Sequence, residues 1–154
     1  MKKHIFAFLT GLALSTCALA QVTVTAPWIR ATVPQGSATG AFMQLRSARD
    51  ARLLEVRSKV AGVTEIHQME MSGQMMRMHA VPGLDLAAGK TVDLAGGGYH
   101  IMLMDLKRQL KEGETVPLTL LVEYKDKRRE TIQLAVPVKA LTYANPVSPA
   151  PPRH

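Results

Sequence analysis

The chain has 154 residues, a formal net charge of +7 at pH 7, one cysteine and nine methionines, and only 5% of its residues are aromatic. This length supports one ordinary domain. The basic residues are scattered singly except in the run KDKRRE at 125–130, which lies between two strand-like segments and is predicted to be a solvated turn. The sequence therefore predicts no nucleic-acid partner.

The first twenty residues have the pattern of a secretory signal peptide. Two lysines form a positive start, an apolar run follows over 5–13, and 18–20 (ALA) is a small-x-small cleavage site. The apolar run is too short to span a bilayer. We predict cleavage before Gln21, a periplasmic location and no membrane span after cleavage. A lipoprotein signal at Cys17 is the alternative, and the threonine that precedes the cysteine disfavours it.

Cleavage of residues 1–20 leaves 134 residues and lowers the net charge from +7 to +5, because two lysines are the only charged residues lost. It also removes the only cysteine. The mature protein then has no disulfide and no thiolate, although export takes it to a compartment where disulfides form. Its stability must therefore come from a packed core.

The rest of the chain is predicted to consist of many short strands. Strand-like runs, separated by turn residues, cover 22–31, 38–47, 52–60, 63–71, 74–81, 90–94, 99–106, 115–124 and 129–138. No stretch has a sustained helical period, and short strands at a spacing of about 8–12 residues favour an antiparallel sandwich or barrel. We predict one all-β domain over 21–140 and a Pro-rich, disordered tail over 141–154.

One predicted hairpin carries an unusual set of side chains, HQMEMSGQMMRMH, beginning at His67. Ser72–Gly73 is a good two-residue loop between runs that alternate polar and apolar residues. A turn centred there places Met69 opposite Met76 and His67 opposite Met78. Directly opposed residues share one face of the sheet, so this pairing predicts that His67 lies beside Met78.

A later segment, HIMLM, repeats the pattern of soft donors at alternate positions. Successive side chains of a strand point to opposite faces, so His100, Met102 and Met104 share one face. If this strand lies over the hairpin, two imidazoles and two thioethers meet, from His67, Met78, His100 and Met102.

This donor set favours Cu(I). Thioether sulfur is soft and uncharged and, combined with imidazole in the absence of thiolate or carboxylate, selects Cu(I) over Zn²⁺, Mg²⁺ or Ca²⁺. Zinc sites usually recruit Cys, His or carboxylate, and the nearest acid, Glu70, is expected to face the other way. A blue-copper site needs a cysteine. The spacing of residues reveals no Ser-His-Asp or Cys-His grouping, so no enzymatic activity is predicted.

Packing is the alternative interpretation of each of these residues, because methionine fills irregular cores. However, seven of the eight mature methionines fall between 69 and 104, beside three of the four mature histidines. This clustering favours a site. Met43 is predicted to be a core residue, His79 to face away from the site, and His154 to be at most an adventitious Cu(II) donor. Packing or accessory donor roles stay open for Met69, Met71, Met75, Met76 and Met104.

The sequence resembles the periplasmic copper chaperones of the PCuAC type, which share a cupredoxin-like Greek-key β-barrel. Ten residues separate His67 from Met78, and twenty-one separate Met78 from His100-Ile101-Met102. This spacing matches the family motif of His or Met, then Met, then His-x-Met. The stretches TVTAPWIRAT and GGGYHIMLMDLKRQLKEGE and the segment up to about Val138 are also similar to the family.

The resemblance implies Cu(I) binding by His67, Met78, His100 and Met102, with delivery to the copper sites of cytochrome c oxidase. The implied partner is a copper acceptor such as oxidase subunit II, at its Cu-A centre, or another copper assembly factor. The extra methionines favour an alternative, periplasmic copper buffering or resistance. A redox carrier, which the lack of thiolate disfavours, and a metal-free adhesion or assembly module also stay open.

Overall fold

A computed structural model describes residues 21–96 and 98–144. This part of the chain is all-β, as predicted, and contains no helix that is long and apolar enough to cross a membrane. The predicted signal peptide and residues 145–154 of the predicted tail lie outside the described residues. The strands are β1 (Val22–Arg30), β2 (Ala38–Ser47), β3 (Ala51–Arg57), β4 (Ala61–Ser72), β5 (Met75–Val81), β6 (Leu84–Leu86), β7 (Thr91–Asp93), β8 (Tyr99–Leu106), β9 (Thr115–Tyr124) and β10 (Arg129–Lys139).

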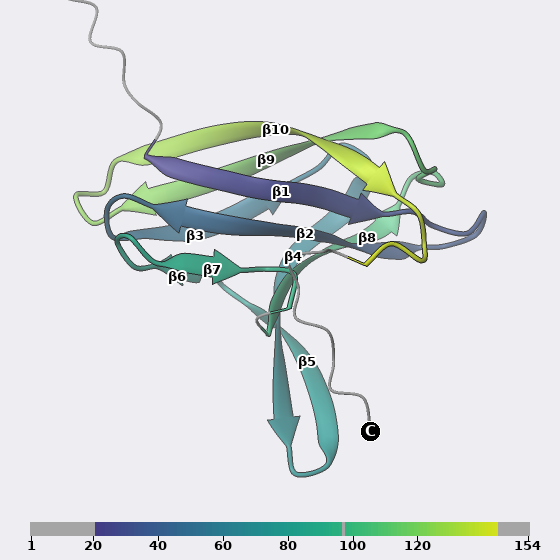
Figure 1. Cartoon of the computed structure of the whole chain (residues 1–154), viewed down its shortest axis with the longest axis horizontal. Coiled ribbons are helices and arrows are strands. Elements are labelled where there is room, and N and C mark those ends of the chain that lie inside the picture. The colour runs from purple at the N-terminus through teal and green to yellow at the C-terminus, as the bar shows by residue number, and fades with distance from the viewer. Residues whose placement is uncertain (1–20, 97, 145–154) are drawn as a thin grey trace, which may run out of the picture.

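The strands form one strongly curved sheet in the order β5-β4-β8-β2-β1-β10-β9-β3-β6, and the short β7 pairs with β2. All pairs are antiparallel except β1 with β10, which are parallel. Figure 1 shows these strands lying around a common interior. The pairing of β1 with β10 joins the beginning of the described chain to its end and links the two halves of the sheet.

The interior is filled by apolar side chains, which alternate with more exposed residues along the strands of the barrel. In β9, Val116, Leu118, Leu120 and Val122 are buried, whereas the residues between them are at least partly exposed. Met43 is also fully buried, which confirms its prediction as a core residue. This period of two, with one face toward the core, is what a sheet covered on one side requires.

The hairpin formed by β4 and β5 extends beyond the rest of the sheet. Strand β4 pairs with β8 only as far as Gln68, whereas its pairing with β5 continues to Ser72. The outer part of the hairpin therefore stands away from the barrel (Figure 1). From Met69 to Ala80 every residue is exposed, so the chain leaves the packed core just beyond His67.

The register of this hairpin differs from the sequence prediction by two residues. Met69 pairs with Met78, and His67 pairs with Ala80, so His67 does not lie directly opposite Met78. The two loop residues are Gly73 and Gln74, not Ser72 and Gly73. Gly73 has a φ of 66°, and glycine at the first loop position suits a type II′ turn. A shift of two keeps every side chain on its predicted face, because the side-chain period of a strand is two.

The last described residues lie against the barrel. The ring of Tyr143 meets that of Trp28 edge-on at a centroid distance of 4.8 Å, and Trp28 stacks on Phe42 at 4.4 Å. Strand β10 ends at Lys139. The first four residues of the predicted tail, 141–144, therefore follow the barrel surface.

Candidate metal centre

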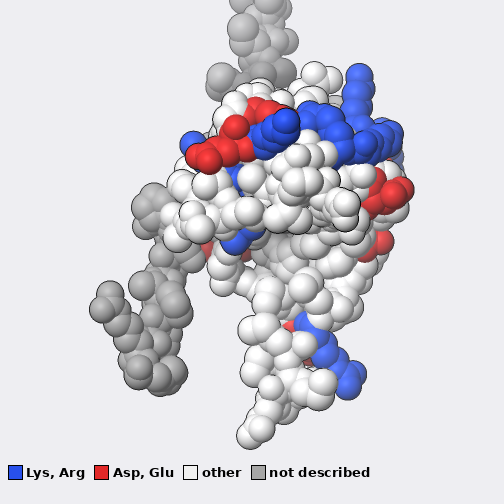
Figure 2. Space-filling model, turned by 90° about the vertical axis from the view of Figure 1, so that its right-hand side faces the viewer, with Lys and Arg blue, Asp and Glu red and all other residues white. Residues whose placement is uncertain are grey.

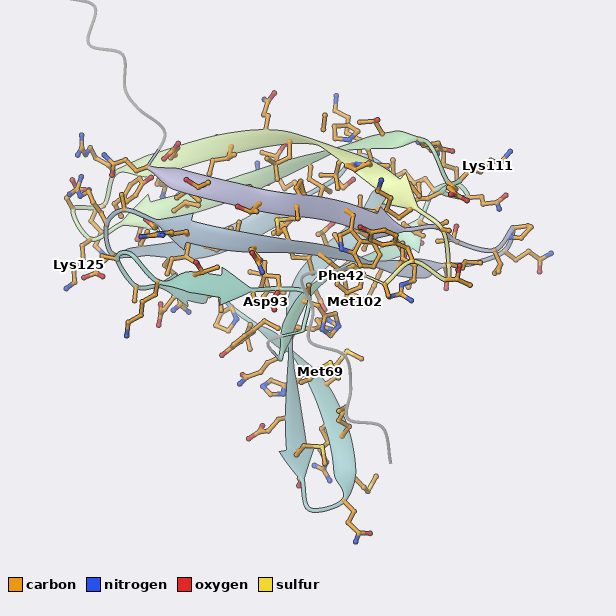
Figure 3. The ribbon with its side chains drawn as sticks, in the orientation of Figure 1. Phe42, Met69, Asp93, Met102, Lys111 and Lys125 are labelled. Carbon is orange, nitrogen blue, oxygen red and sulfur yellow. The ribbon has the colours of Figure 1, made fainter. Side chains whose placement is uncertain are left out.

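Three neighbouring strands bring the four predicted donors to one face of the sheet. The β4–β8 register pairs His67 with His100 and places Met102 two residues farther along β8. The β4–β5 register places Met78 opposite Met69, so Met78 is a diagonal cross-strand neighbour of His67 on the same face. Figure 3 shows Met102 at the junction of barrel and hairpin, with Met69 where the hairpin begins. His67, Met78, His100 and Met102 form what we call the inner site.

The two imidazoles of the inner site lie next to each other. Their ring centroids are 5.8 Å apart and the rings are inclined by 69°. His100 is 8% exposed, and burial, followed by the nearby His67, lowers the pKa of His100 below its ordinary value. His100 is therefore held in the neutral form, which is the form that binds a metal ion.

Glu65 orients the second imidazole and was missed by the sequence prediction. Its Oε2 lies 2.8 Å from Nε2 of His67, whose side chain is only 14% exposed. Nδ1 of His67 is buried and has no hydrogen-bond partner within the described residues. If the carboxylate accepts a hydrogen bond from Nε2–H, the lone pair is on Nδ1, as in many metal sites where an acid fixes the tautomer of a histidine ligand.

The thioethers of the inner site face an open cavity of about 500 Å³ between the barrel and the hairpin. Met78 is 54% exposed and Met102 is half-buried. Both line the cavity together with His100, while Phe42 and Gly40 of β2 form part of its wall. The site is thus built on packed strands on one side and remains open to solvent on the other.

Sulfur is needed to complete a metal site at this position. In the described ranges 21–96 and 98–144, no three His, Cys, Asp or Glu side chains gather as they would around a metal ion. Glu70 pairs with Arg77, and strand alternation places it on the opposite face from Met69, although it still forms part of the cavity lining. The uncharged thioethers beside the imidazoles can supply the further ligands, and this combination suits a soft monovalent ion.

The other candidate residues separate into distinct positions. Met69, Met71 and Met76 line the same cavity as the inner site. His79 pairs with Gln68 and lies on the opposite face, as predicted. Met104 shares the face of Met102 but lies farther along β8, opposite Val63 and Ala38, and does not line the cavity.

Gly98 leads the chain into the strand that carries His100. It has a φ of 87° and its carbonyl accepts a hydrogen bond from the Met69 amide at 2.6 Å. An added Cβ would meet only the Met69 carbonyl oxygen, at 3.7 Å. The requirement for glycine is therefore conformational, because residues with a Cβ rarely adopt a positive φ.

Replacing Gly98 by alanine is expected to lower the free energy of unfolding by about 1–2 kcal/mol, which is the cost of a left-handed backbone with a Cβ. Urea unfolding of the metal-free protein measures this loss. Gly89→Ala is the matched control, since Gly89 has a φ of 72° and open space around an added Cβ. Equal losses are expected in the two variants, and an unchanged midpoint in Gly98→Ala contradicts the strained geometry.

Comparison with known proteins gives matches that span most of the chain. Residues 22–138 match the model of the family described as LpqE-like. The protein Lxx21020 of Leifsonia xyli subsp. xyli, whose name suggests a lipoprotein, is 34% identical over 149 residues, which cover 89% of this chain and 86% of that protein.

Solved structures share the fold. The solution structure of CuI-DR1885 from Deinococcus radiodurans superposes with a TM-score of 0.60 and is 34% identical, covering 82% of this chain and 83% of that one. The copper-bound PCuAC domain from PmoF2 has a TM-score of 0.57 at 22% identity and covers 79% of this chain and 96% of that domain. These likenesses confirm the predicted cupredoxin-like β-barrel. The family match and the likeness to PCuAC structures together show that the chain belongs to the LpqE-like family, of the PCuAC type.

Proposed function

We propose that this protein is a periplasmic copper chaperone that carries one Cu(I) ion in the inner site and transfers it to a copper acceptor. The observation that carries the proposal is the placement of two imidazoles and two thioethers, from β4, β5 and β8, on one face of the sheet. Met78, His100 and Met102 also line one open cavity. The relatives DR1885 and PmoF2, whose structures contain copper, support it.

The chemistry of the donors favours Cu(I) over other ions. All four ligands are neutral, so the ion keeps its single positive charge and gains no electrostatic stabilisation from an anionic ligand. Soft sulfur and imidazole bind Cu(I) well, whereas hard cations need oxygen ligands. This ligand set holds copper in its reduced state without the thiolate of an electron-transfer site, so the protein is proposed to be neither a redox carrier nor an enzyme.

Exposure of the site favours transfer to another protein. Met78 lies on the hairpin side of the cavity and is 54% exposed, so an incoming ligand could replace it while His67 and His100 still held the ion. A recipient that offers thiolates binds Cu(I) more strongly than neutral thioethers do, because its ligands are anionic as well as soft. The Cu-A centre of cytochrome c oxidase subunit II is the proposed recipient.

A transfer experiment tests this function. The Cu(I)-loaded protein is incubated anaerobically with the metal-free Cu-A domain of subunit II, and the two proteins are separated and assayed for copper. Movement of copper to the acceptor is expected. Retention of the copper by this protein argues instead for buffering or resistance, the second candidate function, which the exposed methionines of the hairpin favour.

Two observations support a periplasmic location for the protein. Residues 1–20 have the composition of a signal peptide, and the relative Lxx21020 has a name that suggests a lipoprotein. Fractionation of cells that express the full chain tests the location, with recovery in the periplasmic fraction expected.

Replacing Glu65 by glutamine is expected to weaken Cu(I) binding about 10- to 100-fold, the usual effect of losing an acid that orients a histidine ligand. Glutamine keeps the size of the side chain, but its neutral amide oxygen accepts the hydrogen bond from Nε2–H of His67 more weakly than a carboxylate does. Competition with a chromogenic Cu(I) chelator measures the affinity. Glu112→Gln, at an exposed position that does not line the cavity, is the control and leaves the affinity unchanged.

A further inference from the structure

The outer half of the β4–β5 hairpin presents three more thioethers on the face of the inner site. Met69, Met71 and Met76 are 36%, 61% and 64% exposed. None of them packs into the core of the barrel, and none belongs to the four donors of the inner site. All three line the cavity that His100 and Met102 also line.

The strand register sets these methionines close to one another. Met71 pairs with Met76, and Met69 pairs with Met78 of the inner site. Opposed residues have Cβ atoms about 4.5–5.5 Å apart, and diagonal neighbours remain within reach of a long side chain. Methionine is long, unbranched and flexible, so sulfurs from two adjacent pairs can meet around a single ion.

The two faces of the hairpin differ in chemistry. The face opposite to these methionines carries the cross-strand pairs Glu70 with Arg77, and Gln68 with His79. The methionine face contains no charged residue beyond Met69. In Figure 2 the projecting hairpin is largely uncharged, with its charged atoms along one side. The thioethers are thus gathered on one face, and Glu70 is the one charged residue that lines the cavity with them.

Hydrophobic burial alone does not account for this face. Every apolar side chain from 67 to 79 is methionine, with no leucine, isoleucine, valine or aromatic residue. A strand that only needed an apolar face would use β-branched or aromatic residues, which have the higher strand propensity. The property these side chains share beyond their apolar character is the thioether sulfur, which binds soft metal ions.

We propose that Met69, Met71 and Met76 form a second Cu(I) site, the outer site, which is built from thioethers alone. Its position opposite Met78 lets an ion bound there move to the inner site by exchanging one sulfur ligand at a time. Copper remains Cu(I) throughout, so the step needs no oxidant or reductant. The role of the outer site as an entry point rests on the proposed function, whereas its binding of Cu(I) does not.

Anaerobic titration of the mature protein with Cu(I), with a chromogenic chelator as competitor, tests the outer site. The wild type is expected to bind two ions, the second more weakly because its ligands include no imidazole. Met71→Leu/Met76→Leu is expected to bind one ion with the tight affinity retained. Met75→Leu is the matched control, because Met75 is 66% exposed on the same hairpin but pairs with Ser72 on the opposite face, and it is expected to bind two.

Carbon-13 labelling of the methionine ε-methyl groups gives a second readout on the wild type. The second equivalent of Cu(I) is expected to shift the signals of Met69, Met71 and Met76 and to leave that of Met75 in place. Binding of a single ion by the wild type, or of two ions by Met71→Leu/Met76→Leu, overturns the outer site. Loss of the second ion in Met71→Leu/Met76→Leu supports the outer site. A separate result, unaltered tight affinity after Met78 and Met102 are changed, would refute the inner site and leave the outer site standing.

Discussion

Replacing Met78 and Met102 together by leucine is expected to lower the affinity for the first Cu(I) ion by at least about 100-fold. Leucine has nearly the volume of methionine but no lone pair, so two of the four donors are lost while the shape of the site is kept. A 100-fold change corresponds to about 2.7 kcal/mol, since each tenfold step is about 1.4 kcal/mol. Anaerobic chelator competition measures it directly.

A matched variant separates ligation from a general effect of removing sulfur. Met75→Leu combined with Met104→Leu changes one methionine in each of the same two strands, β5 and β8. Met75 lies on the other face of the hairpin, and Met104 lies outside the cavity. This control is expected to keep the affinity for the first ion. If the Met78 and Met102 variant also keeps it, those two residues are not ligands.

Replacing Leu103 by alanine is expected to lower the free energy of unfolding by about 2–5 kcal/mol, the usual cost of truncating a buried leucine. Leu103 is 0% exposed and lies in β8 between Met102 and Met104. Its side chain points to the core, whereas those two methionines point to the opposite face. Urea unfolding of the metal-free protein measures the loss.

The position of Leu103 also predicts what the substitution leaves intact. Below its unfolding transition, Leu103→Ala is expected to bind Cu(I) with the stoichiometry of the wild type, because the donor face of β8 is unchanged. Leu141→Ala is the surface control, since Leu141 is 49% exposed and such changes usually alter stability by no more than about 0.5 kcal/mol. A loss below about 1 kcal/mol in Leu103→Ala shows that the interior readily adjusts at this position.

The faces of the donor strands were predictable because the side-chain period of a strand does not depend on which strand lies beside it. Alternation alone puts His100 and Met102 on one face of their strand and sends Leu103 to the other. It does the same for His67 and Met69 in the hairpin. Even the error in hairpin register left these faces correct, because the shift was by two residues.

The register itself was not predictable from the loop residues. Ser72–Gly73 and Gly73–Gln74 are both acceptable two-residue loops around one glycine, and local sequence does not decide between them. The structure uses Gly73 as the first loop position, with a φ of 66°. The consequence is that Met69, and not His67, lies directly opposite Met78.

Glu65 shows a different limit of sequence analysis. Glu65 lies two residues before His67, so strand alternation already places the two side chains on one face. A single acid at this spacing is common on exposed strands, however, and does not by itself indicate a contact with the histidine. Only the packing of β4 against β8 buries His67, leaves its Nδ1 without a partner in the described chain and makes the Glu65 contact meaningful.

The sequence by itself determined the all-β class, the four candidate donors and the faces on which they lie, because residue type and a period of two are local properties. Only the tertiary structure decided that β4 pairs with β8, so that His67 meets His100, and that β4 and β5 run on past the barrel and expose their methionines. The physical reason is that strand pairing and strand length beyond the core depend on contacts between segments distant in the chain, which no local pattern encodes.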